Sequence, residues 1–135
     1  MKVLITGGAG YLGSVLTERL LNSGYSVTIL DNLMYNQTSL IHYSHNKNFD
    51  FIYGDVRNHK LLEELVPSFD VVIPLAAIVG FPACDRDKDL ATAVNYDHVR
   101  KICEIAKDRK IPIFNLKTDV EKFSMYMSQT IMLTS

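Results

Sequence analysis

Apolar residues recur along this chain in two alternating patterns: short continuous runs and longer stretches with helical spacing. The short runs predict strands at residues 2–6, 26–30, 49–53, 70–75 and 111–114. The helical spacing predicts helices at residues 11–23, 58–66 and most of 87–110. A polar stretch at residues 32–48 predicts a long loop with one helical turn near residues 39–41, and residues 81–86 also read as a loop.

The same spacing predicts which helical side chains enter the core. The expected core-facing residues of the three helices are Leu12, Val15, Leu16 and Leu20, then Leu61, Leu62, Leu65 and Val66, and finally Val99, Ile102, Cys103 and Ala106. His59 and His98 are expected on helix surfaces. Regular alternation of strands and helices predicts an α/β fold, a parallel sheet with helices on both faces. We expect the strand order 3-2-1-4-5, with a ligand crevice where the winding reverses between strands 1 and 4.

A glycine-rich turn joins the first strand to the first helix. It reads Thr6-Gly7-Gly8-Ala9-Gly10-Tyr11-Leu12-Gly13. Gly7 permits a tight turn, Gly10 permits close approach of a pyrophosphate, and Gly13 permits the helix to pack close to the strand. The N–H groups at the helix start would then face the phosphates. Strand, glycine turn, helix and strand in this order predict a Rossmann-like dinucleotide-binding fold, unless the glycines serve backbone geometry alone.

The second strand ends in Asp31, where such folds carry the acid that binds the adenosine ribose. Its carboxylate can accept hydrogen bonds from both ribose hydroxyls. Its charge would repel a 2′-phosphate, and neither Asn32 nor Leu33 offers a cation. The sequence therefore favours NAD over NADP.

Composition narrows the class further. The chain has 135 residues, enough for one domain with a core, and a net charge of −1, which offers no basic surface to nucleic acid or anionic lipid. No segment approaches the roughly 20 apolar residues that span a membrane, and glycines interrupt the apolar start of the chain. Cys84 and Cys103 indicate reduced thiols in a cytoplasmic protein. His42 and His45 lie in a polar loop without further ligands, so no metal site is expected.

Several short motifs together resemble those of the extended short-chain dehydrogenases, and more narrowly the NAD-dependent epimerase/dehydratase group that acts on nucleotide sugars. The motifs are Thr6-Gly7-x-x-Gly10-x-x-Gly13, Asp31-Asn32-Leu33, Asp55-Val56-Arg57, Leu75-Ala76-Ala77 and Ala93-Val94-Asn95. The resemblance covers roughly residues 1–115, which is less than half of a family enzyme. It implies a cofactor-binding domain over residues 1–115 that is only part of the family's fold.

The resemblance also implies a role for each matched residue. The pyrophosphate would be held by Gly7, Gly10, Tyr11, Leu12 and Gly13, and the ribose by Asp31 and Asn32. Asp55 would accept a hydrogen bond from the adenine amino group, beside the Val56 backbone. The path toward the nicotinamide would be lined by Leu75, Ala76 and Ala77, and Asn95 would support the cofactor or the strand ends. From the residues alone, Asp55 could instead cap a turn, Leu75–Ala77 could be a plain strand end, and Asn95 could make a helix-local hydrogen bond.

The family's chemistry uses a Tyr with a Lys four residues later, and this chain has no such pair. Tyr126 is followed four residues later by Thr130, and Lys122 precedes Tyr126 in reversed order. We therefore assign no catalytic residue. Residues 116–135 form a divergent tail, which is either one extra helix, with a capping box at residues 118–121, or unrelated sequence.

Three functions fit these observations. The first is a truncated NAD-dependent nucleotide-sugar epimerase/dehydratase with little turnover of its own. The second is a non-catalytic NAD-binding or sensing module, and the third is one half of a split enzyme. A sheet that ends at strand 5 would leave an apolar edge, so we expect a second copy or a complementing chain to associate there.

Overall fold

The computed structural model describes residues 1–79 and 81–115, without the side chains of residues 81–83. The helix expected within residues 116–135 lies outside these residues. Four parallel strands form one sheet: β1 (Lys2–Thr6), β2 (Ser26–Asp31), β3 (Phe49–Tyr53) and β4 (Val71–Pro74). Their order is β3-β2-β1-β4, which confirms the predicted order for the first four strands.

The fifth predicted strand is reduced to a single bridge. Ile113 pairs with Val72 in the parallel sense, with the Val72 N–H donating to the Pro112 carbonyl (3.1 Å) and the Phe114 N–H donating to the Val72 carbonyl (3.0 Å). Residues 111–114 thus run beside β4, where strand 5 was expected. Pro112 has no N–H to donate, which limits the ladder that this segment can form.

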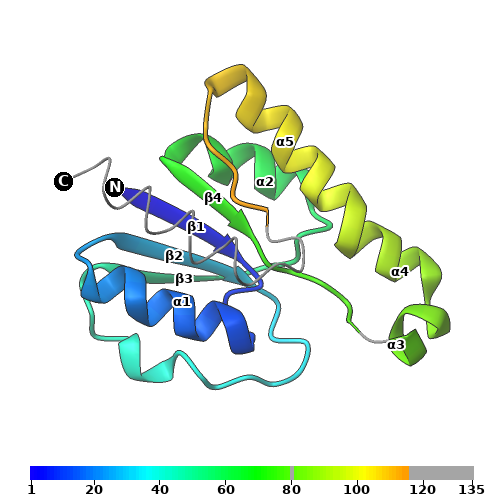
Figure 1. The fold of residues 1–135 in the computed structure, drawn as a ribbon, viewed down its shortest axis with the longest axis horizontal. Helices are drawn as coiled ribbons and strands as arrows, with labels where there is room; N and C mark the ends of the chain where they lie inside the picture. Colours follow the sequence, from blue (N-terminus) through cyan, green and yellow to red (C-terminus); the bar gives the residue numbers. More distant parts are fainter. Residues whose placement is uncertain (80, 116–135) are drawn as a thin grey trace.

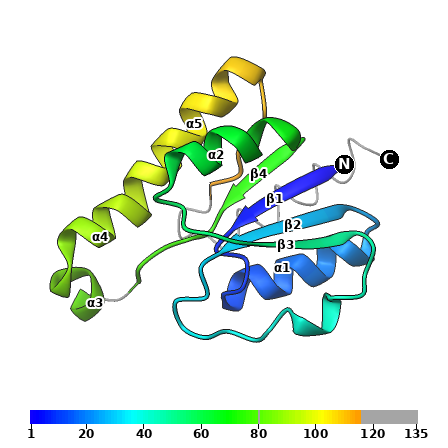
Figure 2. The ribbon, with the colours of Figure 1, turned by 180° about the vertical axis from the view of Figure 1, so that it is seen from behind.

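Helices cover both faces of the sheet (Figures 1 and 2). Helix α1 (Tyr11–Asn22) packs on one face, and α2 (His59–Leu65) and α5 (His98–Arg109) pack on the other. The loop after β2 contains a 3-10 turn at Ile41–Tyr43, and a second 3-10 turn, Val66–Ser68, follows α2. Within the described residues, no helix is long and apolar enough to cross a membrane.

The segment between β4 and α5 is more helical than predicted. It forms α3 (Phe81–Arg86), α4 (Lys88–Thr92) and a π-helical turn at Ala93–Asp97 that runs into α5. The prediction of a loop at residues 81–86 was wrong. Figure 1 shows that α3 and α4 lie beyond the sheet, on the side where the strands end.

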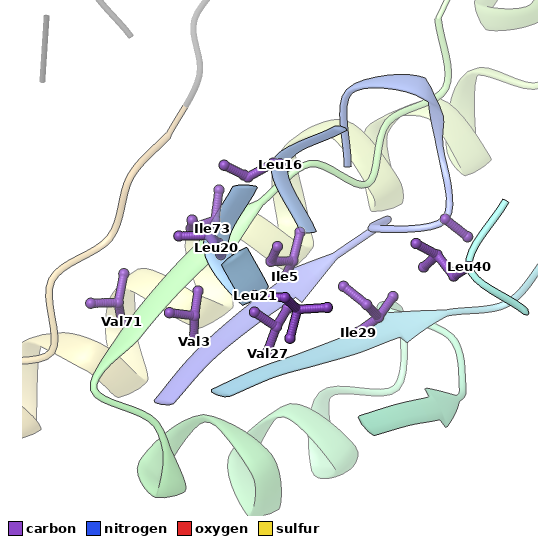
Figure 3. Packing of buried hydrophobic residues seen from close by; sticks show 11 residues of the cluster. Val3, Ile5, Leu16, Leu20, Leu21, Val27, Ile29, Leu40, Val71 and Ile73 are labelled. Carbon is purple, nitrogen blue, oxygen red and sulfur yellow. The ribbon is translucent and has the colours of Figure 1, made fainter. Parts of the chain in front are cut away.

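The core on the α1 side is built from strand residues with an odd number and one stripe of the helix. Figure 3 shows Leu16, Leu20 and Leu21 of α1 over Ile5 and Val27 of the sheet. Leu12 and Val15, expected in this core, are 44% and 40% exposed, so that prediction was wrong. The buried stripe is instead Gly13, Leu16, Thr17, Leu20 and Leu21, and both outliers lie one position before members of it.

The opposite core contains an unpredicted histidine. Val94, His98, Ile102 and Ala106, each four residues after the last, are all buried, and His98 is 0% exposed. The expectation that His98 lies on the helix surface was wrong, and Cys103, expected in the core, is exposed. The helical stripe that faces the sheet begins at Val94 and continues through the π-helical turn, whereas the predicted stripe began at Val99.

Candidate functional site

The residues predicted to bind the cofactor lie at or near the carboxyl ends of the four strands, apart from Asn95, which lies in the π-helical turn before α5. Because the strands are parallel, these ends share one edge of the sheet, where Thr6 pairs with Leu30 and with Pro74, and Asp31 pairs with Tyr53. Contacts between side chains and neighbouring backbone join this edge together. The predicted cofactor-binding residues are Gly7, Gly10, Tyr11, Leu12, Gly13, Asp31, Asn32, Asp55, Val56, Leu75, Ala76, Ala77 and Asn95.

Gly7 lies wedged between the ends of β2 and β4. Its N–H donates to the Leu30 carbonyl (2.8 Å), and its φ of +70° belongs to the left-handed region that side chains disfavour. A Cβ at this position would stand 2.5 Å from the backbone N of Ala76. Gly7 is therefore required both by the turn and by the close approach of the chain that leaves β4.

Gly13 is also required by packing, but its neighbour is not the strand. A Cβ there would lie 2.5 Å from the Cα and the carbonyl oxygen of Gly8. The first turn of α1 thus packs directly onto the glycine turn itself, which corrects the expectation of close packing between helix and strand. This contact fixes the direction in which the helix leaves the turn.

Gly10 caps α1 and is unlike the other two. Its φ of −72° and ψ of 177° are open to any residue, and a Cβ would meet only the Gly7 carbonyl oxygen, at 3.4 Å. The first helical hydrogen bond runs from the Ser14 N–H to the Gly10 carbonyl (2.9 Å), so the N–H groups of Tyr11, Leu12 and Gly13 precede the helical ladder. Nothing in the described protein requires Gly10, while these N–H groups form the standard cradle for an anion.

Asp31 ties the glycine turn to the end of β2. One carboxylate oxygen accepts the Ala9 N–H (3.0 Å) and the other accepts the Leu33 N–H (2.8 Å), and the residue is 6% exposed. A carboxylate has about four acceptor positions, so two remain for further donors. The acid thus shapes the turn and keeps the capacity to bind two hydroxyl groups.

Asp55 is held by two neighbours at the end of β3. Arg57 forms a two-pronged ion pair with it, through Nε (2.9 Å) and Nη2 (2.7 Å), and the Asn32 amide donates to the same carboxylate (3.3 Å). The hydrogen bonds from Arg57 lower the pKa of Asp55 to about 2. Its Oδ1 also accepts the Arg57 N–H (2.9 Å), so Asp55 does cap a turn. Val56 between them is buried.

The chain beyond β4 is fixed by Asn95. The Asn95 side chain accepts the Ile78 N–H (2.7 Å) and donates to the Ile78 carbonyl (2.9 Å), so it binds both backbone polar groups of one residue. The alternative of a helix-local hydrogen bond was wrong. Leu75 and Ala76 are half-buried and Ala77 is exposed, so the segment that Asn95 anchors presents small side chains at the edge of the sheet.

The family follows from the whole-chain comparison. Residues 3–129 match the model of the NAD dependent epimerase/dehydratase family. The chain belongs to this family. One relative, a UDP-N-acetyl-alpha-D-glucosaminuronate decarboxylase of Bacillus cytotoxicus, is 37% identical over 120 residues, covering 88% of this chain and 37% of the relative. A bifunctional UDP-glucose 4-epimerase and UDP-xylose 4-epimerase of Arabidopsis thaliana is 33% identical over 109 residues, covering 70% of this chain and 31% of that protein.

Solved structures agree with this epimerase/dehydratase assignment. The structure of Pal from Bacillus thuringiensis superposes with a TM-score of 0.81 at 29% identity, covering 87% of this chain and 39% of that one. The Thermus thermophilus UDP-glucose 4-epimerase, solved in complex with NAD, gives a TM-score of 0.71 at 29% identity and covers 84% and 37%. The chain thus spans about a third of the length of these relatives, from 31% to 39%.

Sequence reasoning missed three side chains that shape the edge in this family member. Arg57 was noticed only as part of a motif, yet its spacing from Asp55 suits a two-pronged pair. Ser39, in the loop after β2, donates to the Ala9 carbonyl (2.9 Å), and no local pattern signals this contact. His98 could have been found, because it stands midway between two buried apolar residues, Val94 and Ile102.

Proposed function

We propose that this chain binds NAD along the carboxyl edge of its sheet and supplies the cofactor-binding part of a nucleotide-sugar epimerase or dehydratase. The observation that carries the proposal is the pairing of an unobstructed helix start at Gly10 with the buried carboxylate of Asp31. The first offers N–H donors to a pyrophosphate, and the second offers acceptors to a ribose. The helix start and the Asp31 carboxylate are joined by a hydrogen bond, which the N–H of Ala9 donates to Asp31.

The adenosine half would lie over the ends of β2 and β3. Asp31 has two acceptor positions left for the ribose hydroxyls. The hydrogen bond from Asn32 to Asp55 supports an adenine contact adjacent to the ribose contact. Asp31 would repel a 2′-phosphate. Arg57, the cation at this end, is already paired with both oxygens of Asp55. We therefore propose that NAD is preferred over NADP.

The nicotinamide half would extend past Leu75, Ala76 and Ala77 toward Ile78, whose backbone Asn95 holds. When bound, the nicotinamide supplies hydride transfer, and the protein supplies binding, orientation and exclusion of water. The names of the relatives, which are decarboxylases, epimerases and dehydratases of UDP- and dTDP-sugars, support a nucleotide sugar as the substrate of the whole protein. They favour this function over a cofactor sensor.

Thermal unfolding of the 135-residue chain, with and without NAD and NADP, tests the proposal. A ligand at a hundred times its dissociation constant stabilises the folded state by about 2.7 kcal/mol. For a domain of this size we expect NAD to raise the unfolding midpoint by on the order of 10 °C, and NADP to raise it much less. A cooperative transition that neither dinucleotide shifts would overturn the proposal, and equal shifts would overturn the preference for NAD.

A further inference from the structure

A buried histidine links the helical layer to the end of β1. His98 stands at the start of α5 and is 0% exposed. Its Nδ1 contacts the Val94 carbonyl one turn earlier, and its Nε2 lies 3.4 Å from the Thr6 hydroxyl. An imidazole in this core is costly unless both nitrogens have partners. Here both do, and one partner belongs to the sheet.

The two partners fix the form of the ring. A carbonyl can only accept, so Nδ1 carries the proton, and in the neutral ring Nε2 is then an acceptor. The Thr6 hydroxyl therefore donates to His98. Burial favours this neutral form, because it lowers the pKa of the imidazole. The contact is a directed hydrogen bond from the last residue of β1 to the first residue of α5.

Thr6 adjoins both the glycine turn and the chain that leaves β4. It is 0% exposed, its carbonyl accepts the Leu75 N–H (2.9 Å), and it directly precedes Gly7. Gly7 lies so close to the backbone of Ala76 that a side chain on Gly7 would clash with it. Thr6 is thus bonded to the chain that leaves β4 and is covalently joined to the glycine turn that packs against that chain.

The same helical segment also contacts the chain that continues from β4. Asn95, three residues before His98, binds both backbone groups of Ile78 beyond β4. Both residues belong to or adjoin the π-helical turn Ala93–Asp97, an irregularity that proteins often place at functional sites. One helical segment therefore contacts β1 through His98 and the continuation of β4 through Asn95.

We propose that His98 is a positioning residue for the dinucleotide. By holding Thr6, it sets the separation between the glycine turn and the end of β4, across which the pyrophosphate and nicotinamide would lie. This inference rests on the proposed function. It also makes a prediction of its own: substitution of His98 should not change the affinity for the adenosine half, which would bind over β2 and β3.

Two substitutions test the hydrogen bond from its two ends. Thr6→Val removes the hydroxyl at nearly constant volume, and His98→Phe removes both ring nitrogens. We expect each to weaken NAD binding about tenfold, which corresponds to roughly 1.4 kcal/mol. Binding of adenosine, which has no phosphate and would contact only the β2 and β3 side, should change less than twofold. Isotope-labelled protein titrated with NAD or adenosine and followed by NMR gives both affinities.

The controls separate positioning from general loosening. Thr6→Ser keeps the hydroxyl and should restore NAD affinity. Ile102→Val, one turn further along α5 and equally buried, should lower the unfolding midpoint without changing either affinity. Unchanged NAD binding in Thr6→Val, or equal losses of NAD and adenosine binding, would overturn the inference. If the unaltered chain binds no NAD, the proposed function itself has failed.

Discussion

At the scale of single residues, the glycine turn contains two kinds of glycine. Gly7 and Gly13 are required by the protein, because a Cβ at either would press into backbone at 2.5 Å. Gly10 has an ordinary extended conformation, and a Cβ on it would meet only the Gly7 carbonyl oxygen, at 3.4 Å. A side chain at Gly10 would be tolerated by the fold but would obstruct the proposed ligand. A substitution there therefore separates stability from binding.

Gly10→Ala should therefore leave the free energy of unfolding within about 0.5 kcal/mol of the parent value, while NAD binding falls at least tenfold. The added methyl group would stand where the pyrophosphate must approach the backbone. Urea unfolding and calorimetric titration check the two parts. Gly13→Ala is the matched contrast: it should lower stability by about 1–3 kcal/mol through the clash with Gly8. Full NAD affinity in Gly10→Ala would remove Gly10 from the binding site.

Asp55 and Arg57 allow a second prediction at this scale. Because the folded pKa of Asp55, about 2, lies below the ordinary value of 3.8, the pair stabilises the protein above about pH 4 and loses this effect as the pH falls toward 2. Arg57→Ala should raise the pKa of Asp55 toward 3.8. The pair is partly exposed, so the accompanying loss of stability at pH 7 should be only about 0.2–1 kcal/mol.

Carbon-13 NMR of the Asp55 carboxyl group follows this titration directly. Arg57→Lys is the informative control, since it keeps the charge and removes the two-pronged geometry, and it should give an intermediate pKa. If Asp55 in Arg57→Ala still titrated near 2, hydrogen bonds from the backbone and Asn32 would be holding the carboxylate, and Arg57 would have no part in it.

At the scale of elements, the sequence predicts what local pattern controls. The four strands end within a residue of the predicted positions, because short apolar runs bounded by turn residues have few alternatives in a buried parallel sheet. The faces of helices were harder. Leu12 and Val15 are apolar, yet they lie one position off the stripe that the sheet selects. The fifth strand and α3 depend on Pro112 and on packing beyond β4, which no local periodicity records.

This difference in burial predicts opposite outcomes for two neighbours on α1. Leu16→Ala, at a residue 3% exposed, should reduce the free energy of unfolding by about 2–5 kcal/mol because it opens a cavity against the sheet. Val15→Ala, at a residue 40% exposed, should stay within about 0.5 kcal/mol, since alanine also favours the helix. Chemical denaturation measures both. A large loss in Val15→Ala would mean that the sequence-based face was right.

At the scale of the whole molecule, the site is a product of topology. Residues from Gly7 to Ala77 meet at one edge because every strand runs the same way, so the alternation of elements was enough to predict their convergence. The contacts that lock this edge, such as Ser39 with Ala9 and His98 with Thr6, join residues 30 and 92 positions apart. A single sequence holds no signal for such pairs. The roles assigned to the converging residues stay predictions until ligand binding is measured.

The buried imidazole of His98 should make the stability of the whole domain sensitive to mild acid. Burial lowers its pKa below 6.5, so the neutral ring stabilises the fold fully above about pH 6.5, and the effect declines as the pH falls below that value. Of the charged groups nearby, His59 of α2 acts in the same direction, and Glu63 and Lys101 pair with each other. Between pH 7.5 and 5.5, His98 should therefore contribute to a loss of stability.

Urea unfolding at the two pH values isolates this contribution. His98→Phe should be less stable at pH 7.5 but should lose less stability than the parent chain on going to pH 5.5, because no ring remains to take up a proton on unfolding. Thr6→Val keeps the imidazole buried and should keep the full pH dependence. An identical loss in the parent and in His98→Phe would show that the histidine binds its proton equally well in the folded state. The neutral ring, and with it the direction of the hydrogen bond from Thr6, would then have to be abandoned.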